Sequence, residues 1–190
     1  MGYTKQAREA FFTRPSFSIA DVRRLLPKAS HSYVSLMLHN LEKRGDIHRI
    51  SRGIYSYSDD AIVAGFAFRP FYLGLQDAMS IHGIWEQETN PVVVSPRKVR
   101  SGLRKYANGN YTVRRISRKL FFGYETLKYS GFFVPVSTVE KTLIDLVHYR
   151  QHIPADAQNE FRKRVKKKEL NELLKRCPKA LAEKVKKLLK

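Results

Sequence analysis

Hydrophobic positions follow a helical period in the N-terminal part of the chain. Apolar side chains recur there at intervals of three and four residues, the spacing that places them on one face of an α-helix. The pattern predicts helices over residues 4–13, 19–26 and 30–44. Charged and small polar side chains occupy the opposite faces, so each helix is expected to pack on its neighbours by one side only.

Local residue choices mark the ends of the second and third helices. Ser18 and Ser30 stand at their starts, where a serine hydroxyl can accept from the free backbone N–H groups of the first turn. Pro27 follows the second helix, because the residue before a proline is displaced from the helical region. Gly45 follows the third helix and can adopt the left-handed exit conformation.

The period changes from helical to alternating after the third helix. Two isoleucines precede a break at Arg52-Gly53, and Ile54 and Tyr55 follow it. A glycine at such a break is typical of a β-hairpin turn. Three helices followed by a two-stranded ribbon predict a winged helix-turn-helix over residues 1–58, which would bind DNA.

The outer face of the third helix carries small polar groups and one apolar tip, which suits the donors, acceptors and thymine methyls of a major groove. The residues predicted to contact bases are Ser32, Tyr33, Ser35, Leu36 and His39. The residues predicted to contact phosphates are Lys28, Ser30, Lys43, Arg49 and Arg52. The alternative is a small helical domain that binds protein and leaves this face solvated.

The remaining chain predicts a mixed α/β domain over residues 61–153 and basic amphipathic helices over 154–190 that pack on it. Its predicted elements are a helix at 71–82, strands at 91–95, 111–116, 119–124 and 131–136, and a helix at 138–150. Glu140 is interpreted as a cap of the last helix. The fold class is therefore α+β, with a winged head, a mixed α/β domain and a basic helical tail.

Charge narrows the choice of partner. The 190 residues carry a formal net charge of +19, with a sequence pI near 10.2. The net charge is +4 over residues 1–60, +7 over 61–153 and +8 over 154–190. Such a balance points to a polyanion, with nucleic acid first and an anionic membrane surface second. No apolar run is long enough to span a bilayer, so no membrane partner is expected.

Catalytic and metal-binding patterns are absent from the sequence. The six histidines do not form a zinc spacing such as H-E-x-x-H, and there is no P-loop or G-x-S-x-G motif. The 17 acidic residues form no cluster that would hold a hard cation. We therefore expect no enzymatic activity, no catalytic residue, no metal and no cofactor. The single cysteine, Cys177, and the lack of an apolar signal core favour a cytoplasmic setting.

Several segments, in order along residues 15–150, resemble the AbiEi-type antitoxins, which are transcriptional regulators of type IV toxin–antitoxin and abortive-infection operons. The segments are Arg52-Gly53-Ile54-Tyr55 at the hairpin, Phe71 to Ala78 running to His82-Gly83, Val92 to Val94 followed by Ser95-Pro96-Arg97, and Val136 to Asp145. The chain departs from the family at Val139-Glu140-Lys141, where many relatives have Pro-Glu-Arg.

The resemblance implies a head that binds inverted repeats in its own promoter, and a homodimer on that DNA is a candidate assembly. It also implies a second domain that counteracts a nucleotidyltransferase-like toxin, with or without contact. The alternative function is an RNA-binding or ribosome-associated protein, in which the lysine-rich tail dominates. Aromatic residues among the basic strands would then stack on bases, although half-buried sheet positions also explain them.

Overall fold

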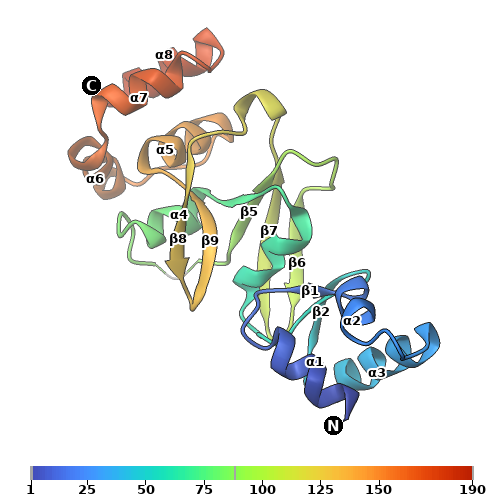
Figure 1. The fold of residues 1–190 in the computed structure, drawn as a ribbon. Helices are drawn as coiled ribbons and strands as arrows, with labels where there is room; N and C mark the ends of the chain where they lie inside the picture. The colour runs from blue at the N-terminus through green and yellow to red at the C-terminus, as the bar shows by residue number, and fades with distance from the viewer. Residues whose placement is uncertain (1, 88, 190) are drawn as a thin grey trace. The chain divides into compact units, whose positions relative to one another are not determined.

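The structure, a computed structural model, describes residues 2–87 and 89–189 and is mixed α+β (Figure 1). The first residue of the predicted head and the last residue of the predicted tail lie outside these ranges. The chain divides into two compact units. The first comprises Met1–Arg69 and Leu103–Tyr111, and the second comprises Pro70–Gly102 and Thr112–Lys190.

The first unit begins with the helices α1 (Tyr3–Phe11), α2 (Ile19–Leu25) and α3 (His31–Lys43). Each agrees with its predicted range to within about two residues at either end. Their apolar stripes meet in one core around Phe17, whose ring stacks on Phe11 at 4.9 Å and on neighbouring tyrosines. The helical spacing identified the buried side of α3 correctly, whereas Phe12 and Leu25, which the same spacing placed on the apolar sides of the first two helices, are exposed.

A small antiparallel sheet completes the packing of these helices. Its strands are β1 (Phe17–Ser18), β2 (His48–Ser51) and β3 (Ile54–Ser56), in the order β1-β3-β2. The hairpin β2–β3 lies where the alternating pattern predicted it. The strand β1 was not predicted, because two residues are too few to display an alternation. Through β1, the segment before α2 is tied to the far edge of the hairpin.

The first unit extends beyond the predicted boundary at residue 58. A 3₁₀ segment, η1 (Ala61–Phe68), and the chain Leu103–Tyr111 cluster with it. The hydroxyl of Tyr106 donates to the carbonyl oxygen of Ser58 at 2.6 Å. A boundary drawn from local composition misses this segment, because its attachment depends on a hairpin some forty residues further along the chain.

The second unit is organised on a mixed sheet in which strands run in the order β6-β7-β5-β4-β9-β8. The strands are β4 (Tyr72–Leu73), β5 (Val92–Ser95), β6 (Gly102–Tyr106), β7 (Gly109–Arg115), β8 (Tyr124–Tyr129) and β9 (Phe132–Ser137). The hairpin β6–β7 is divided, because its residues Leu103–Tyr111 cluster with the first unit. β5 pairs with β7 in parallel and with β4 in antiparallel register.

The helices of the second unit share one hydrophobic core with the sheet. They are α4 (Leu75–Ile81), α5 (Val139–His148), α6 (Ala155–Arg164), α7 (Lys167–Leu174) and α8 (Lys179–Leu188). Phe161, Leu170, Leu174 and Val185 of the last three helices are buried in that core. Residues 154–190 therefore belong to the same compact unit as the sheet rather than forming a separate part.

Two element predictions in this unit were wrong. The predicted helix at 71–82 is a strand at Tyr72–Leu73 followed by the shorter helix α4. The predicted strand at 119–124 is a 3₁₀ turn, η2 (Arg118–Leu120), followed by irregular chain up to β8. Each stretch contains a short apolar run, Phe71 to Leu73 in one and Leu120 to Phe122 in the other, and such runs do not distinguish a buried strand from a buried helix or turn.

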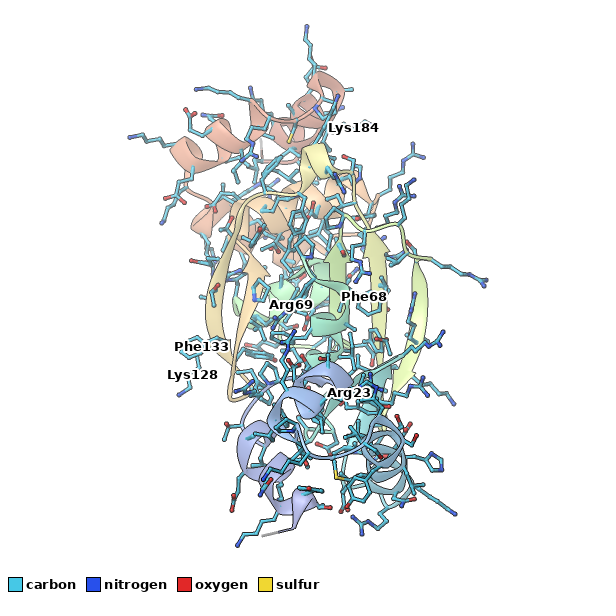
Figure 2. All side chains as sticks on the ribbon, turned by 45° about the vertical axis from the view of Figure 1, so that its right-hand side comes forward. Arg23, Phe68, Arg69, Lys128, Phe133 and Lys184 are labelled. Carbon is cyan, nitrogen blue, oxygen red and sulfur yellow. The ribbon has the colours of Figure 1, made fainter. Side chains whose placement is uncertain are left out.

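The hairpin β8–β9 is the most exposed part of the second unit's sheet. Lys128 pairs with Phe133 across it, and both side chains point outward (Figure 2). The Phe133 side chain is 69% exposed. Lys128 is likewise exposed.

Candidate nucleic-acid interface

The helix α3 is fixed at its start by a local cap. The hydroxyl of Ser30 accepts from the backbone N–H of Tyr33 at 3.1 Å. This satisfies one of the N–H groups that a first helical turn leaves free. The cap holds the first turn, which carries Ser32 and Tyr33, in helical geometry.

The two sides of α3 differ sharply in burial. Val34, Met37, Leu38 and Leu41 are buried in the core of the first unit. All five residues predicted to contact bases lie on the exposed side. The contrast is clearest between two leucines, because Leu36 is 57% exposed and Leu38 is 1% exposed. An exposed leucine amid hydroxyl and imidazole groups offers a surface with both polar and apolar contacts.

Two of the five side chains already make contacts within the first unit. The ring of Tyr33 lies edge-on to that of Tyr3, with centroids 5.6 Å apart. The hydroxyl of Ser35 donates to the carbonyl oxygen of His31 at 3.0 Å. These contacts orient both side chains and leave the Ser35 oxygen able to accept a hydrogen bond.

The hairpin β2–β3 presents two arginines. Arg52 lies in its turn beside Gly53. The φ of Gly53 is +75°, a left-handed backbone conformation that residues other than glycine rarely adopt. The register shifts by one residue between Arg49 and Ser51. Arg49 Nε donates to the carbonyl oxygen of Ser51 at 3.4 Å, and both arginines are exposed.

The other residues predicted to contact phosphates are also on the surface of the first unit. Lys28 precedes α3, and Lys43 lies in its last turn. Ser30 is exposed, and while its oxygen accepts as the helix cap, its O–H is still able to donate. The structure thus places all ten predicted residues on the surface of one unit.

Arg23 of α2 was not among the predicted contacts. Its side chain is half-buried, and within the described residues its buried Nε has no hydrogen-bond partner. A buried donor without an acceptor costs free energy. The sequence indicated only that Arg23 faces outward, because the burial of one guanidinium nitrogen depends on tertiary packing.

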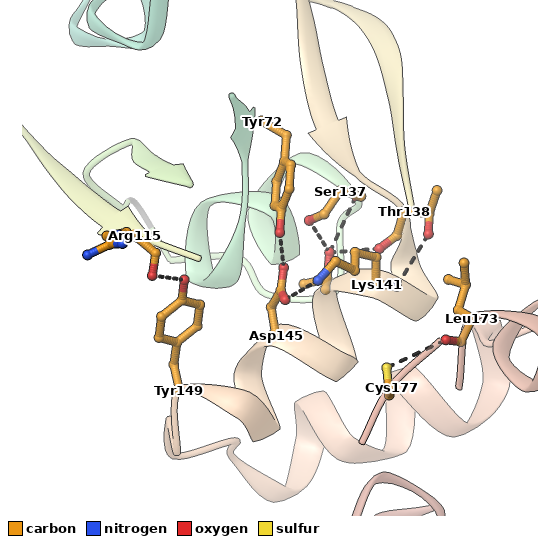
Figure 3. A network of polar contacts seen from close by, with 10 residues as sticks. Tyr72, Arg115, Ser137, Thr138, Lys141, Asp145, Tyr149, Leu173 and Cys177 are labelled. Carbon is orange, nitrogen blue, oxygen red and sulfur yellow. Dashed lines mark hydrogen bonds and ion pairs between the residues drawn. The ribbon is translucent and has the colours of Figure 1, made fainter. Parts of the chain in front are cut away.

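A second constellation lies inside the second unit (Figure 3). The hydroxyl of Tyr72 donates to Asp145 Oδ2 at 2.7 Å, and the Lys141 ammonium pairs with the other carboxylate oxygen. Lys141 and Asp145 are fully buried. Burial raises the pKa of Asp145 above its ordinary value and lowers the pKa of Lys141 below its own. The network joins the strand β4 to the helix α5.

Glu140 has a different role from the predicted helix cap. The cap is Thr138, whose hydroxyl accepts from the N–H of Lys141 at 3.3 Å. Glu140 is buried, and its carboxylate accepts from the backbone N–H of Lys166 at 2.9 Å. It therefore supports the start of α7, a long-range contact that no local pattern reveals.

Within residues 2–87 and 89–189, no group of three or more histidine, cysteine or acidic side chains is arranged to hold a metal ion. His82 Nε2 lies 2.7 Å from the carbonyl oxygen of Ser137. Cys177 is half-buried and its thiol donates to the carbonyl oxygen of Leu173.

In the same described ranges, no helix has the length and apolar content required to cross a membrane.

Comparisons with known proteins give a likeness of fold. No protein-family model matches the chain, and no curated protein matches it. Among solved structures, it is similar to the crystal structure of the Rv2827c protein from Mycobacterium tuberculosis, with 13% sequence identity and a TM-score of 0.66. The match covers 98% of this chain and 76% of that chain. At this identity the similarity concerns the mixed α+β fold alone.

Proposed function

We propose that residues 1–58 are a winged helix-turn-helix that binds duplex DNA, with α3 in the major groove and the hairpin β2–β3 as the wing. The observation that carries the proposal is the exposed side of α3. It offers two serines, a tyrosine, a histidine and a leucine while the opposite side is buried. A helix with such a face is of the right width and chemistry for base edges in a major groove.

Cationic and hydroxyl groups around α3 support the same proposal. Contacts to phosphates would set the register of the protein on the duplex without reading its sequence. The residues proposed for these contacts are Lys28, Ser30, Lys43, Arg49 and Arg52. Arg49 and Arg52 come from the hairpin, which follows α3 directly in the chain.

We further propose that the protein is a transcriptional regulator and antitoxin of the AbiEi type. The protein would repress its own operon through promoter inverted repeats and counteract a nucleotidyltransferase-like toxin without being an enzyme itself. The sequence resemblance over residues 15–150 supports this part, and the likeness of fold to Rv2827c adds no function. A growth assay with a nucleotidyltransferase encoded beside this gene tests it: co-expression should relieve the toxicity, and persistent growth arrest would reject it.

Duplex binding is tested by fluorescence anisotropy on labelled DNA from the region upstream of the gene, with scrambled DNA of equal length beside it. Neutralising about six phosphates would give a slope near −5 for log affinity against log salt. Arg52→Ala should weaken binding to both duplexes and lower that slope by about 0.9. Lys128→Ala, on the exposed hairpin of the second unit, is the matched control and should change neither.

Specific readout is tested by Leu36→Ala and His39→Ala. Each should reduce the preference for upstream over scrambled DNA, by about 1–3 kcal/mol for a good base contact. Neither should change the salt slope, because neither side chain faces a phosphate. A preference that survives both substitutions would show that this side of α3 does not read DNA.

A further inference from the structure

A small pocket lies in the second unit, remote in sequence from α3. It has a volume of about 260 Å³ and is lined by Pro70, Pro96, Arg97, Arg118 and Phe121. Its walls are two prolines and an aromatic ring, and two guanidinium-bearing side chains complete it. This composition suits a ligand that is flat and apolar in one part and anionic in another.

The pocket is built where parallel strands end. The carboxyl ends of β5 and β7 share one edge of the sheet, and the N–H of Ile116 donates to the carbonyl oxygen of Ser95 at 3.0 Å. Ser95 is fully buried, and its hydroxyl donates to the carbonyl oxygen of Pro70 at 2.9 Å and accepts from the N–H of Arg97 at 3.3 Å. Segments remote in sequence are thereby fixed together, at the kind of sheet edge where ligands bind.

The aromatic wall is held in place from behind. Phe121 stacks on Tyr72, with centroids 5.3 Å apart and planes 24° from parallel, and lies against Tyr124 at 5.0 Å. Tyr72 is itself anchored by its hydrogen bond to Asp145. The ring is therefore oriented before any ligand arrives, so that stacking on it would cost little conformational entropy.

The chain segments that supply most of the pocket carry charge of one sign. Residues 89–124 contain no aspartate or glutamate. The cations of this stretch that belong to the second unit are Arg97, Lys98, Arg100, Arg114, Arg115, Arg118 and Lys119. Two line the pocket, and the others flank it along the chain in the segments after β5 and at the end of β7. They offer more positive charge than one small anion would need.

We propose that this pocket holds one unpaired base of a single-stranded nucleic acid. The base stacks on Phe121 between the prolines, and Arg97 and Arg118 pair with the phosphates on either side of it. Its volume lies just below the range of drug-sized sites, as one base requires. A paired base in a duplex is unable to enter, because its faces are covered by its neighbours. The site is separate from α3 and does not depend on the proposal for duplex DNA.

The test is binding of the full-length protein to a labelled thymidine hexamer, a uridine hexamer and an abasic hexamer of equal charge, measured by fluorescence anisotropy. We expect the abasic strand to bind about tenfold more weakly than the thymidine strand, because stacking on an aromatic ring stabilises each base. Phe121→Leu should weaken thymidine binding about tenfold, leave abasic binding unchanged and leave the salt slope unchanged. Phe121→Tyr should retain the affinity.

Further variants distinguish the effect of stacking from the effects of charge and of loss of folding. Arg118→Ala should lower the salt slope by about 0.7 on single strands, whereas Lys184→Ala, which removes one exposed charge from α8, should not change it. Arg118 is exposed, so this variant tests the site even if Phe121→Leu unfolds, which a thermal melt would reveal. Leu36→Ala on α3 should leave single-strand binding intact, so that failure of one proposal is distinguishable from failure of the other.

Equal affinity for abasic and thymidine strands would overturn the proposal, since it would mean that phosphates alone are bound. An unchanged salt slope in Arg118→Ala would overturn it as well. Dependence on Phe121 for either the thymidine or the uridine strand supports it, and the tighter of the two identifies DNA or RNA as the ligand.

Discussion

The two units have interiors of different chemistry. Among the buried polar side chains of the described residues, Ser56 lies in the first unit. The other seven, which include Asp77, Glu140, Lys141 and Asp145, lie in the second. The first unit is thus held mainly by apolar burial, and the second also depends on hydrogen bonds and an ion pair within its core. Since buried charges are costly unless they are paired, the second unit should be far more sensitive to loss of one polar partner.

Lys141→Met should produce the largest loss of stability. It leaves the buried Asp145 carboxylate without its cation, and breaking a buried pair on one side costs about 3–5 kcal/mol. Urea unfolding followed by the fluorescence of Trp85 measures it, because this tryptophan packs against the same core. The triple variant Lys141→Met, Asp145→Leu, Tyr72→Phe removes every partner at once and should recover most of the loss.

The control for this experiment is Lys128→Met, which makes the same chemical change on the exposed β8. Its unfolding free energy should remain within about 0.5 kcal/mol of the parent. If Lys141→Met is equally mild, the ion pair is not a structural requirement, and the contrast between the two interiors disappears.

The next largest effect is expected in the first unit. Leu38→Ala should cost about 2–5 kcal/mol, because it leaves a cavity in an apolar core. Leu36→Ala, two residues away on the exposed side of α3, should cost less than about 0.5 kcal/mol. Chemical denaturation followed by circular dichroism measures the unfolding free energies of the two variants, which differ only in the side of α3 that is changed. Equal losses would mean that Leu36 is packed against protein, and the proposed DNA-reading side would then be wrong.

The same contrast explains how much of the fold the sequence could predict. In the first unit, caps such as Ser18 and Ser30 and clean apolar periods act over a few residues, so α2 and α3 were located to within about one residue. The exposure of the predicted contact residues on α3 followed from the same periods. Before residue 58, β1 was missed, since its existence depends on pairing with β3 rather than on its own two residues.

In the second unit the local patterns predicted less. Phe71, Tyr72 and Leu73 are all buried, so their run showed no alternation and was interpreted as helix. The role of Glu140 and the partnership of Lys141 with Asp145 depend on contacts across the fold. The pocket at Phe121 brings together segments near residues 70, 96 and 118 through the pairing of β5 and β7. No residue spacing along the chain predicts such a site.

The smallest effect concerns the acid response of the first unit. The hydroxyl and the backbone N–H of Ser18 donate to Asp21, and these hydrogen bonds lower the pKa of Asp21 below 3.8. A carboxylate whose pKa is lower in the folded state stabilises it above the unfolded value, and this contribution disappears as the pH falls through the folded value. Stability of α2 should therefore decline below about pH 4, and the decline should be small because solvent screens the partly exposed Asp21 carboxylate.

Asp21→Asn should remove this acid dependence, and amide hydrogen exchange along α2 between about pH 3 and 5 would measure it locally. Asp145 in the second unit should not contribute with the same sign, because burial raises its pKa instead of lowering it. An acid loss of protection in α2 that persists in Asp21→Asn would mean that the capping box is not its source. The acid response of the first unit would then come from charged groups other than the Asp21 carboxylate.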